Sequence, residues 1–288
     1  MSNTATVLAF DFGASSGRAI RAVYDGQNLT YEEIHRFENV PIEKDGHLCW
    51  DVETLLKEIH TAIQKAGTFD SLGFDTWGVD FGLLDTDGHL LANPVHYRDA
   101  RTNGKPEQAA ARMPAEELYA HTGNQIMAIN TLFQLLALQE QESELLQKAE
   151  QILFMPDLFA ALLGAEPVCE RSIASTSQML DPRTGQWSRE VLTAYGLKEN
   201  HFAPLVASGT VTGTLTTGAK IIAVAGHDTQ CASAAMPCAE EDVEHTAFLS
   251  CGTWSLLGTE LDTPILTADS CQSGLSNELG ANGKINYQ

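Results

Sequence analysis

A glycine- and serine-containing segment near the amino terminus has the composition of a phosphate-binding turn. It reads DFGASSGR from Asp11 to Arg18 and directly follows the apolar run Thr6–Phe10. Glycine lets backbone N–H groups point at an anion without a Cβ in the way, and serine hydroxyls add donors. Asp11 could hold Mg²⁺, through water because this ion keeps most of its hydration shell. The segment therefore predicts an anion-binding site. It matches neither the GxxxxGK[ST] nor the GxGxxG phosphate-binding motif, and the alternative is an ordinary hairpin turn.

A second carboxylate follows another apolar run. Asp228 stands in the sequence GHDT, directly after the apolar run Lys220–Ala225. A carboxylate where a strand ends and a helix begins is well placed to face a cleft. It could accept the proton of an attacking hydroxyl in a phosphoryl transfer. The alternative is that Asp228 caps a helix over Thr229–Met236, and the two roles are compatible. His227 by itself is more often a structural residue than a ligand.

The segment DTWGVD places two carboxylates and an indole around a glycine. These residues are Asp75, Trp77, Gly78 and Asp80. Carboxylates accept hydrogen bonds from hydroxyl groups, and an indole can cover the C–H face of a sugar. The segment therefore suits a polyol, and the alternative is a buried tryptophan beside capping acids.

The segment Tyr97–Thr102 packs two arginines around one aspartate. On this evidence alone a surface ion pair is the favoured interpretation. Such a pair carries no functional prediction.

The elements that position these motifs follow from hydrophobic periodicity. Apolar and alternating runs predict strands over 6–10, 19–24 and 29–37, which form an antiparallel meander. A helix is predicted over Asp51–Ala66, with Asp51 as N-cap and Gly67 as its end. Further buried strands are predicted over 71–74 and 220–225, each leading into a motif.

An internal echo suggests a second, related domain. LAFDFGA over 8–14 and AFLSCGT over 247–253 are each an apolar strand that ends in a glycine turn. The echo predicts two related domains that each direct a glycine hairpin at one ligand.

Composition limits the classes of partner. The chain of 288 residues has 43% hydrophobic and 19% charged residues, which is typical of about two globular domains. Its net charge of −21 repels nucleic acid and anionic membranes, and no apolar run reaches the ~18 residues of a membrane span. The chain has no leader pattern, and its 6 cysteines form no CxxC pair. We therefore expect a cytoplasmic protein with reduced thiols and with neither nucleic-acid nor membrane partners.

Five segments together resemble one protein family. FDFGASSGR, FDTWGVDFGLLD, YRDARTNG, AGHDTQCASA and LSCGTWSLLG are similar to motifs of the FGGY carbohydrate kinases, in particular of their rhamnulokinase branch. The resemblance runs from about residue 5 to the end of the chain. It implies an α/β fold with a ribonuclease-H/actin-like amino-terminal domain, a truncated second domain of similar type, and ATP and Mg²⁺ as cofactors. The domains would span residues 1–237 and 238–288.

The resemblance also implies a role for individual residues. Asp228 would be the proton acceptor, and Asp11 would serve the metal. ATP would be contacted by Ala14, Ser15, Ser16, Gly17, Arg18 and Thr253. The sugar would be contacted by Trp77, Gly78, Asp80, His227, Asp228 and Thr229.

The implied reaction is phosphorylation of L-rhamnulose by ATP to L-rhamnulose 1-phosphate, in rhamnose catabolism. Family members are longer than this chain, so we expect impaired turnover, an open apolar face over 238–288 and possible self-association through it. Two alternatives remain at this point. One is a related kinase with another ketose or polyol substrate, and the other is a non-catalytic sugar-binding half-kinase.

Overall fold

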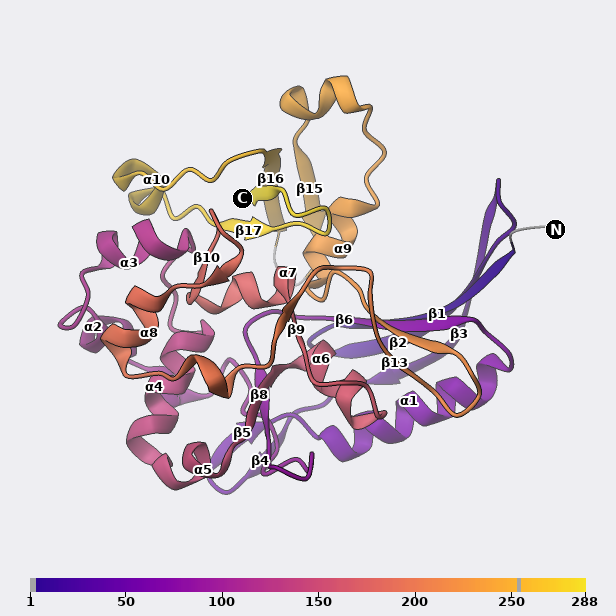
Figure 1. Ribbon diagram of the computed structural model, residues 1–288, viewed down its shortest axis with the longest axis horizontal. Helices are drawn as coiled ribbons and strands as arrows, with labels where there is room; N and C mark the ends of the chain where they lie inside the picture. Colours follow the sequence, from indigo (N-terminus) through magenta and orange to yellow (C-terminus); the bar gives the residue numbers. More distant parts are fainter. Residues whose placement is uncertain (1–3, 253–254) are drawn as a thin grey trace.

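A twisted sheet of six strands forms the centre of the computed structural model, which describes residues 4–252 and 255–288 (Figure 1). Its strands occur in the order β13-β14-β6-β1-β2-β3. Their bounds are β1 (Ala5–Phe12), β2 (Ser16–Tyr24), β3 (Leu29–Glu38), β6 (Ser71–Thr76), β13 (Thr210–Thr214) and β14 (Lys220–Ala223). The predicted meander is confirmed, because β1 and β3 are both antiparallel to β2.

The three neighbouring strands β1, β6 and β14 run parallel to one another. Asp11 of β1 pairs in register with Asp75 of β6. Just beyond β14, His227 forms a parallel bridge with Thr76. Since parallel strands end at the same edge of a sheet, the three carboxylate-bearing motifs meet there.

One face of this sheet is buried. Along β1, Leu8, Phe10 and Phe12 are buried whereas Ala9 between them is exposed, as the two-residue period of a strand requires. The ring of Phe12 stacks on that of Phe159 with centroids 4.8 Å apart. Aromatic contacts of this kind hold the helices to the sheet.

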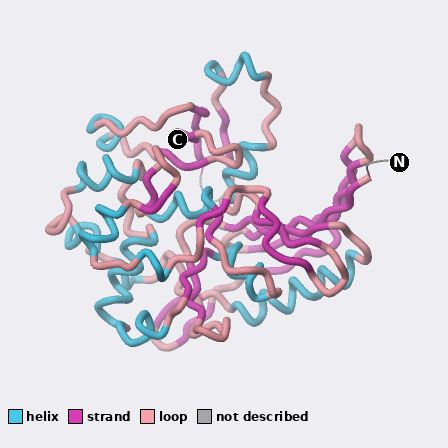
Figure 2. The backbone as a smooth tube through the Cα atoms, in the orientation of Figure 1, coloured by secondary structure: helices cyan, strands magenta, loops and turns pink. Residues whose placement is uncertain are grey.

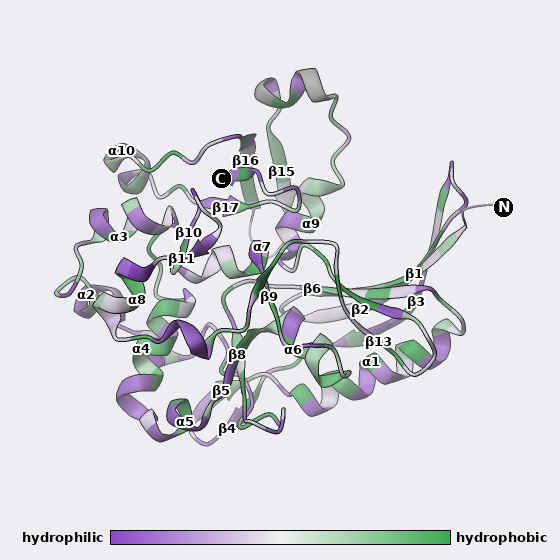
Figure 3. Ribbon diagram, in the orientation of Figure 1, coloured by the Kyte–Doolittle hydropathy of each residue, from purple (hydrophilic) through white to green (hydrophobic). Residues whose placement is uncertain are grey.

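Helix α1 (Val52–Ala66) lies along the sheet, with Asp51 as its N-cap and Gly67 as its C-cap, as predicted. The Asp51 carboxylate accepts a hydrogen bond from the backbone N–H of Thr54. Hydrophobic and hydrophilic residues alternate along this helix because only one side packs on the sheet (Figure 3).

The other helices gather mainly beside the sheet and at its carboxyl edge (Figure 2). No helix in the described ranges has the length and apolarity needed to cross a bilayer. The helices are α2 (Lys105–Ala109), α3 (Ala115–Thr122), α4 (Thr131–Gln141), α5 (Ser143–Lys148), α6 (Met155–Leu162), α7 (Arg171–Ala174), α8 (Arg189–Tyr195), α9 (Asp228–Ala234) and α10 (Ala268–Gln272), with short 3-10 turns η1 (Ala100–Thr102), η2 (Ser175–Ser177), η3 (Glu199–His201) and η4 (Glu240–His245). Four small strand pairs accompany them: β4 (Ile42–Lys44) with β5 (His47–Cys49), β7 (Phe81–Leu84) with β8 (Gln151–Phe154), β9 (Cys169–Glu170) with β12 (Leu205–Val206), and β10 (Leu180–Asp181) with β11 (Gln186–Trp187).

A second sheet contains the carboxyl-terminal strands in the order β15-β16-β18-β17. Its outer part is open, since Leu249 and Leu257 are 63% and 65% exposed, in line with the predicted apolar face. Its inner part is covered, since Leu279 and Ile285 are buried. The division of the chain at residue 237 stays a prediction. The strands are β15 (Phe248–Cys251), β16 (Ser255–Leu261), β17 (Asn277–Leu279) and β18 (Ile285–Tyr287).

Gly17→Ala is expected to lower the free energy of unfolding by about 1–3 kcal/mol. An added Cβ would lie 2.3 Å from Cζ of Phe37, and that ring is itself packed on Phe12. Urea unfolding measures the change. In a double-mutant cycle with Phe37→Leu, the cost of Gly17→Ala should shrink because the obstructing ring is gone. An unchanged cost in that background would contradict the packing argument.

Candidate active site at the carboxyl edge of the first sheet

Three aspartates converge where β1, β6 and α9 meet. Asp11 and Asp75 are register partners on adjacent strands. Asp228 is the first residue of α9 and follows His227, which bridges to Thr76 at the end of β6. Segments far apart in the sequence therefore place their carboxylates at one edge.

The electrostatics of Asp75 show that these groups interact. Burial raises the pKa of Asp75 well above its ordinary value, and the charges of Asp11 and Asp228 raise it further. Arg18 and His227 act in the opposite direction. The glycine turn and Asp228 consequently share one electrostatic environment, although they are more than 200 residues apart in sequence.

The predicted phosphate turn connects β1 to β2. Ala14 and Ser15 lie in the turn, while Ser16, Gly17 and Arg18 begin β2. The hydroxyls of Ser15 and Ser16 make no hydrogen bond to other described residues, so they are free to donate to an anion.

Asn39 holds the shape of this turn, and the sequence motifs did not identify it. Its side-chain amide donates to the carbonyl of Gly13 over 2.9 Å, and its backbone N–H donates to the carbonyl of Ser15 over 3.0 Å. The backbone N–H of Gly13 donates to the carbonyl of Ser16 over 2.9 Å. Asn39 is 3% exposed, as expected for a residue with a fixed structural role. In the sequence, only the position of Asn39 just after the strand β3 could have indicated this role.

Asp11 fits the role of a residue near Mg²⁺. Arg18 contacts its Oδ2 atom through Nε at 2.7 Å and Nη2 at 2.6 Å. In the described part of the chain, Oδ1 has no side-chain partner. A dication would relieve the repulsion between Asp11 and Asp75 that raises the pKa of Asp75. The donor set therefore suits an oxygen-seeking ion held through water.

Asp228 presents its carboxylate at the start of α9. Its Oδ1 atom accepts hydrogen bonds from the backbone N–H of Thr229 at 2.6 Å and from the Thr229 hydroxyl at 3.2 Å. The side chain remains 44% exposed. Since α9 begins at Asp228 with His227 as N-cap, the alternative in which Asp228 caps a helix starting at Thr229 is wrong.

His227 lies between two carboxylates, one of which the sequence motifs did not identify. Its Nδ1 atom is 2.8 Å from Oε2 of Glu278, and its Nε2 atom is 3.3 Å from Oδ1 of Asp228. Burial favours the neutral ring, but the charge and hydrogen bond of Glu278 outweigh it and raise the pKa of His227 to about 9. Glu278 stands on β17, 51 residues further on, and no local motif pointed to it.

Asp80 is buried and accepts hydrogen bonds from four groups. Its Oδ2 atom accepts from the indole N–H of Trp50 at 2.6 Å, from that of Trp77 at 3.0 Å, and from the backbone N–H of Tyr97 at 3.1 Å. Its Oδ1 atom accepts from the side-chain amide of Gln134 at 2.8 Å. Asp80 is 1% exposed, so it holds the aromatic side chains in place rather than facing solvent.

The indoles that Asp80 orients form an aromatic stack. The rings of Trp50 and Trp77 lie 3.9 Å apart, and His96 stacks on Trp50 at 4.1 Å. Gly78 follows Trp77, and an added Cβ there would lie 3.2 Å from Thr176. A side chain at position 78 would therefore press against Thr176.

Glu170 fixes the segment that carries His227 and Asp228. Its Oε2 atom accepts from the backbone N–H groups of Ser172 at 2.9 Å, Ile173 at 3.2 Å and Gly226 at 3.0 Å, and from the Ser172 hydroxyl at 2.6 Å. Its Oε1 atom accepts from the Ser208 hydroxyl at 2.6 Å. Glu170 is 1% exposed. No local motif marks Glu170, because its partners come from three separate segments.

The surface ion pair predicted over Tyr97–Thr102 is wrong. Asp99 accepts from His47 at 3.1 Å and from the backbone N–H of Leu48 at 2.8 Å. Arg101 is 9% exposed and donates to the side-chain oxygen of Gln134 at 3.0 Å. Gln134 in turn donates to Asp80, so Arg101 supports the hydrogen bonds of Asp80 through Gln134.

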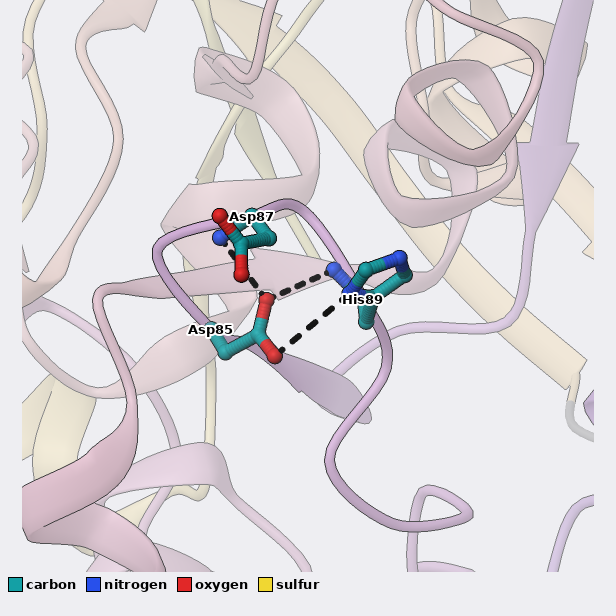
Figure 4. A group of neighbouring side chains, drawn as sticks. All are labelled: Asp85, Asp87 and His89. Carbon is teal, nitrogen blue, oxygen red and sulfur yellow. Dashed lines mark hydrogen bonds and ion pairs between the residues drawn. The ribbon is translucent and has the colours of Figure 1, made fainter.

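Thr253, expected to contact ATP, lies outside the described residues. Asp85, Asp87 and His89 lie close together on a surface turn (Figure 4). There Oδ1 of Asp85 accepts from the backbone N–H groups of Asp87 at 2.9 Å and His89 at 2.8 Å, which accounts for the cluster as a turn.

Stability is expected to depend on the protonation of Asp80. Burial raises the pKa of Asp80 to about 6, against the opposing effect of its hydrogen bonds. A carboxyl group with a higher pKa in the folded protein stabilises the fold when protonated. The free energy of unfolding should thus fall by about 3 kcal/mol through this group as pH rises from about 4 to about 6. Urea unfolding of the unaltered protein and Asp80→Asn across this range isolates the effect, and parallel pH profiles would contradict it.

Comparison with known proteins places these observations in a family. Residues 6–234 match the model of the N-terminal domain of the FGGY family of carbohydrate kinases. The chain is 41% identical to a rhamnulokinase of Bacteroides thetaiotaomicron over 291 aligned residues, covering 96% of this chain and 59% of the relative. It is 39% identical to a rhamnulokinase of Enterococcus faecalis, covering 98% of this chain and 59% of the relative. The chain thus spans about three fifths of the length of these relatives.

Solved structures share the fold. A gluconate kinase from Lactobacillus acidophilus superimposes with a TM-score of 0.81 at 16% identity, covering 99% of this chain and 59% of that one. The predicted α/β fold of the ribonuclease-H/actin-like type is confirmed.

Proposed function

Because the chain belongs to the FGGY family of carbohydrate kinases, we propose that it carries the sugar-binding and first phosphate-binding parts of an ATP-dependent sugar kinase. The observation that supports this most directly is the meeting of the 13–18 turn and Asp228 at one sheet edge. A phosphoryl transfer requires an anion site and a proton acceptor on opposite sides of the phosphate. The 13–18 turn is the candidate for the anion site, and Asp228 is the candidate for the proton acceptor.

The chemistry assigned to Asp228 is proton acceptance. The sugar hydroxyl oxygen bonds to the γ-phosphorus of ATP while the bond from that phosphorus to the β,γ-bridging oxygen breaks. The hydroxyl proton passes to Asp228, and ADP leaves with the electron pair. The backbone and serine hydroxyls of the 13–18 turn bind the phosphates. Mg²⁺, held through water near Asp11, would neutralise charge on those phosphates.

L-Rhamnulose is the proposed sugar, with L-rhamnulose 1-phosphate as product. Two relatives named rhamnulokinase, at 41% and 39% identity, support this choice. Trp77, Gly78 and Thr229 are the proposed contacts of the sugar, with His227 and Asp228 beside them. Asp80 acts by orienting Trp77. We place the activity in the cytoplasm, where ATP is present and the six unpaired cysteines stay reduced.

Sugar binding is the first property to test, because the chain spans 59% of these relatives. Isothermal titration calorimetry with L-rhamnulose, L-fuculose, D-xylulose and glycerol should give the tightest binding for L-rhamnulose. Release of ADP should depend on the same sugar, and ³¹P NMR should identify a 1-phosphate. Tighter binding of D-xylulose or glycerol would redirect the proposal to another kinase of the family. Binding without ADP release would favour the sugar-binding half-kinase. If none of the four sugars bound, the proposed function would be overturned.

A further inference from the structure

We propose that Glu278 is a positioning residue for the base. In this inference, which rests on the proposed function, Glu278 holds His227 as an imidazolium. The imidazolium then fixes one oxygen of Asp228 and leaves the other for the sugar hydroxyl. Glu278 contributes no atom to the reaction itself, and it acts entirely through His227.

The geometry forms a continuous chain of contacts. Oε2 of Glu278 is 2.8 Å from Nδ1 of His227, and Nε2 of the same ring is 3.3 Å from Oδ1 of Asp228. The side chains of Glu278 and His227 are 11% and 12% exposed, whereas that of Asp228 is 44% exposed. The chain thus leads from a buried carboxylate to an accessible one. With a carboxylate facing each nitrogen, both ring nitrogens act as donors only if the ring is charged.

The surroundings of His227 favour that charged form. The groups that face the ring are Glu278 from β17, Asp228 from α9 and Asp75 from β6, and all three are acids. Burial opposes the charge, yet the pKa of His227 is raised to about 9. Burial also opposes ionisation of Glu278, but the charge of His227 lowers the pKa of Glu278 overall. Opposite shifts in the two partners are the pattern of a buried ion pair.

Glu278 is itself held in place. The side-chain amide of Gln230 donates to its Oε2 atom over 2.8 Å. The strand that carries it is fixed to the first part of the chain by two backbone donors. The N–H of Asn277 donates to the carbonyl of Gly123 over 2.8 Å, and the N–H of Leu279 donates to the Ser175 hydroxyl over 2.9 Å. The position of β17 therefore determines the orientation of Asp228.

The two oxygens of Asp228 are consequently different. Oδ1 is engaged by His227 and by the backbone N–H and hydroxyl of Thr229. Within the described residues, Oδ2 has no partner. An oxygen that already accepts two hydrogen bonds and pairs with a cationic ring is a poor proton acceptor, so Oδ2 is the atom that would receive the proton of the sugar.

Proton NMR of histidine labelled with ¹³C at Cε1 tests the state of His227 directly, without any need for turnover. In the unaltered chain, the His227 resonance should begin to titrate only above about pH 8. In Glu278→Gln its midpoint should fall by about two pH units or more, because the opposing charge is lost while the amide keeps the shape. His227→Gln assigns the resonance. Glu260→Gln, which alters an acid of the same second sheet paired with Lys284, is the matched control and should leave the midpoint unchanged.

Turnover gives the second readout. Glu278→Gln should lower kcat by about tenfold or more with little change in KM, and should move the alkaline limb of the pH profile down with the NMR midpoint. A midpoint for His227 below about pH 7 in the unaltered chain would overturn the inference, and so would an unchanged midpoint in Glu278→Gln. In either case Asp228→Asn would still decide the proposed function separately. Absence of sugar binding would contradict the proposed function. The NMR midpoint of His227 would still show whether Glu278 and His227 form an ion pair.

Discussion

Asp228→Asn should lower sugar-dependent ADP release by about 10³–10⁴-fold and leave the dissociation constant of the sugar within about threefold. The amide keeps the size of the side chain and can keep the hydrogen bond from the N–H of Thr229, but it cannot take up a proton at neutral pH. The loss therefore falls on the chemical step rather than on binding. A coupled assay for ADP and calorimetry for the sugar measure the two quantities separately.

Asp87→Asn is the matched control for this experiment. Asp87 is exposed on the surface turn with Asp85 and His89, and it forms no hydrogen bond or ion pair with Asp228, His227 or Glu278, all of which lie in the described part of the chain. The control should keep the rate of the unaltered protein. Near-normal turnover in Asp228→Asn would remove Asp228 from the mechanism. A rate loss fully explained by weaker sugar binding would make it a binding residue only.

Glu170→Ala is expected to lower the free energy of unfolding by about 3–5 kcal/mol. The change leaves the buried N–H groups of Ser172, Ile173 and Gly226 without their acceptor. It also frees Gly226 to move, and with it the adjacent His227. Urea unfolding measures the stability, and sugar calorimetry detects the displacement of the site.

Glu170→Gln separates these causes. Glutamine can direct its oxygen at the three N–H donors and retain the shape of the side chain. We therefore expect this variant to lose much less stability than Glu170→Ala and to keep most sugar affinity. Equal losses in both variants would show that charge, rather than acceptor geometry, gives Glu170 its importance. Normal stability in Glu170→Ala would refute the assigned role.

Local patterns were sufficient wherever one segment contained the whole signal. The helix Val52–Ala66 begins and ends where its cap residues predict. The meander β1–β3 follows from runs bounded by turn residues. The glycine-rich turn and the carboxylate of Asp228 are visible for the same reason, because each follows a recognisable apolar strand.

Local sequence patterns could not identify residues that act through partners distant in sequence. Asp99 and Arg101 looked like a surface pair, yet Arg101 is buried against Gln134, more than thirty residues away. Asn39, Glu170 and Glu278 carry no motif of their own. Their importance lies in the donors and acceptors that folding brings to them, and sequence spacing alone does not encode those distances.

The sequence by itself determined which functional groups are available. They are a glycine turn that can approach phosphate, an aspartate after a strand, and an indole beside a glycine. Residue types and local periodicity suffice for this, because hydrogen-bonding capacity and strand or helix preference are properties of short segments. Only the tertiary structure decided that parallel pairing of β1, β6 and β14 gathers these groups at one edge. It also decided that a glutamate from the second sheet reaches His227. Both depend on long-range packing, in which burial and neighbouring charges change the behaviour of a side chain.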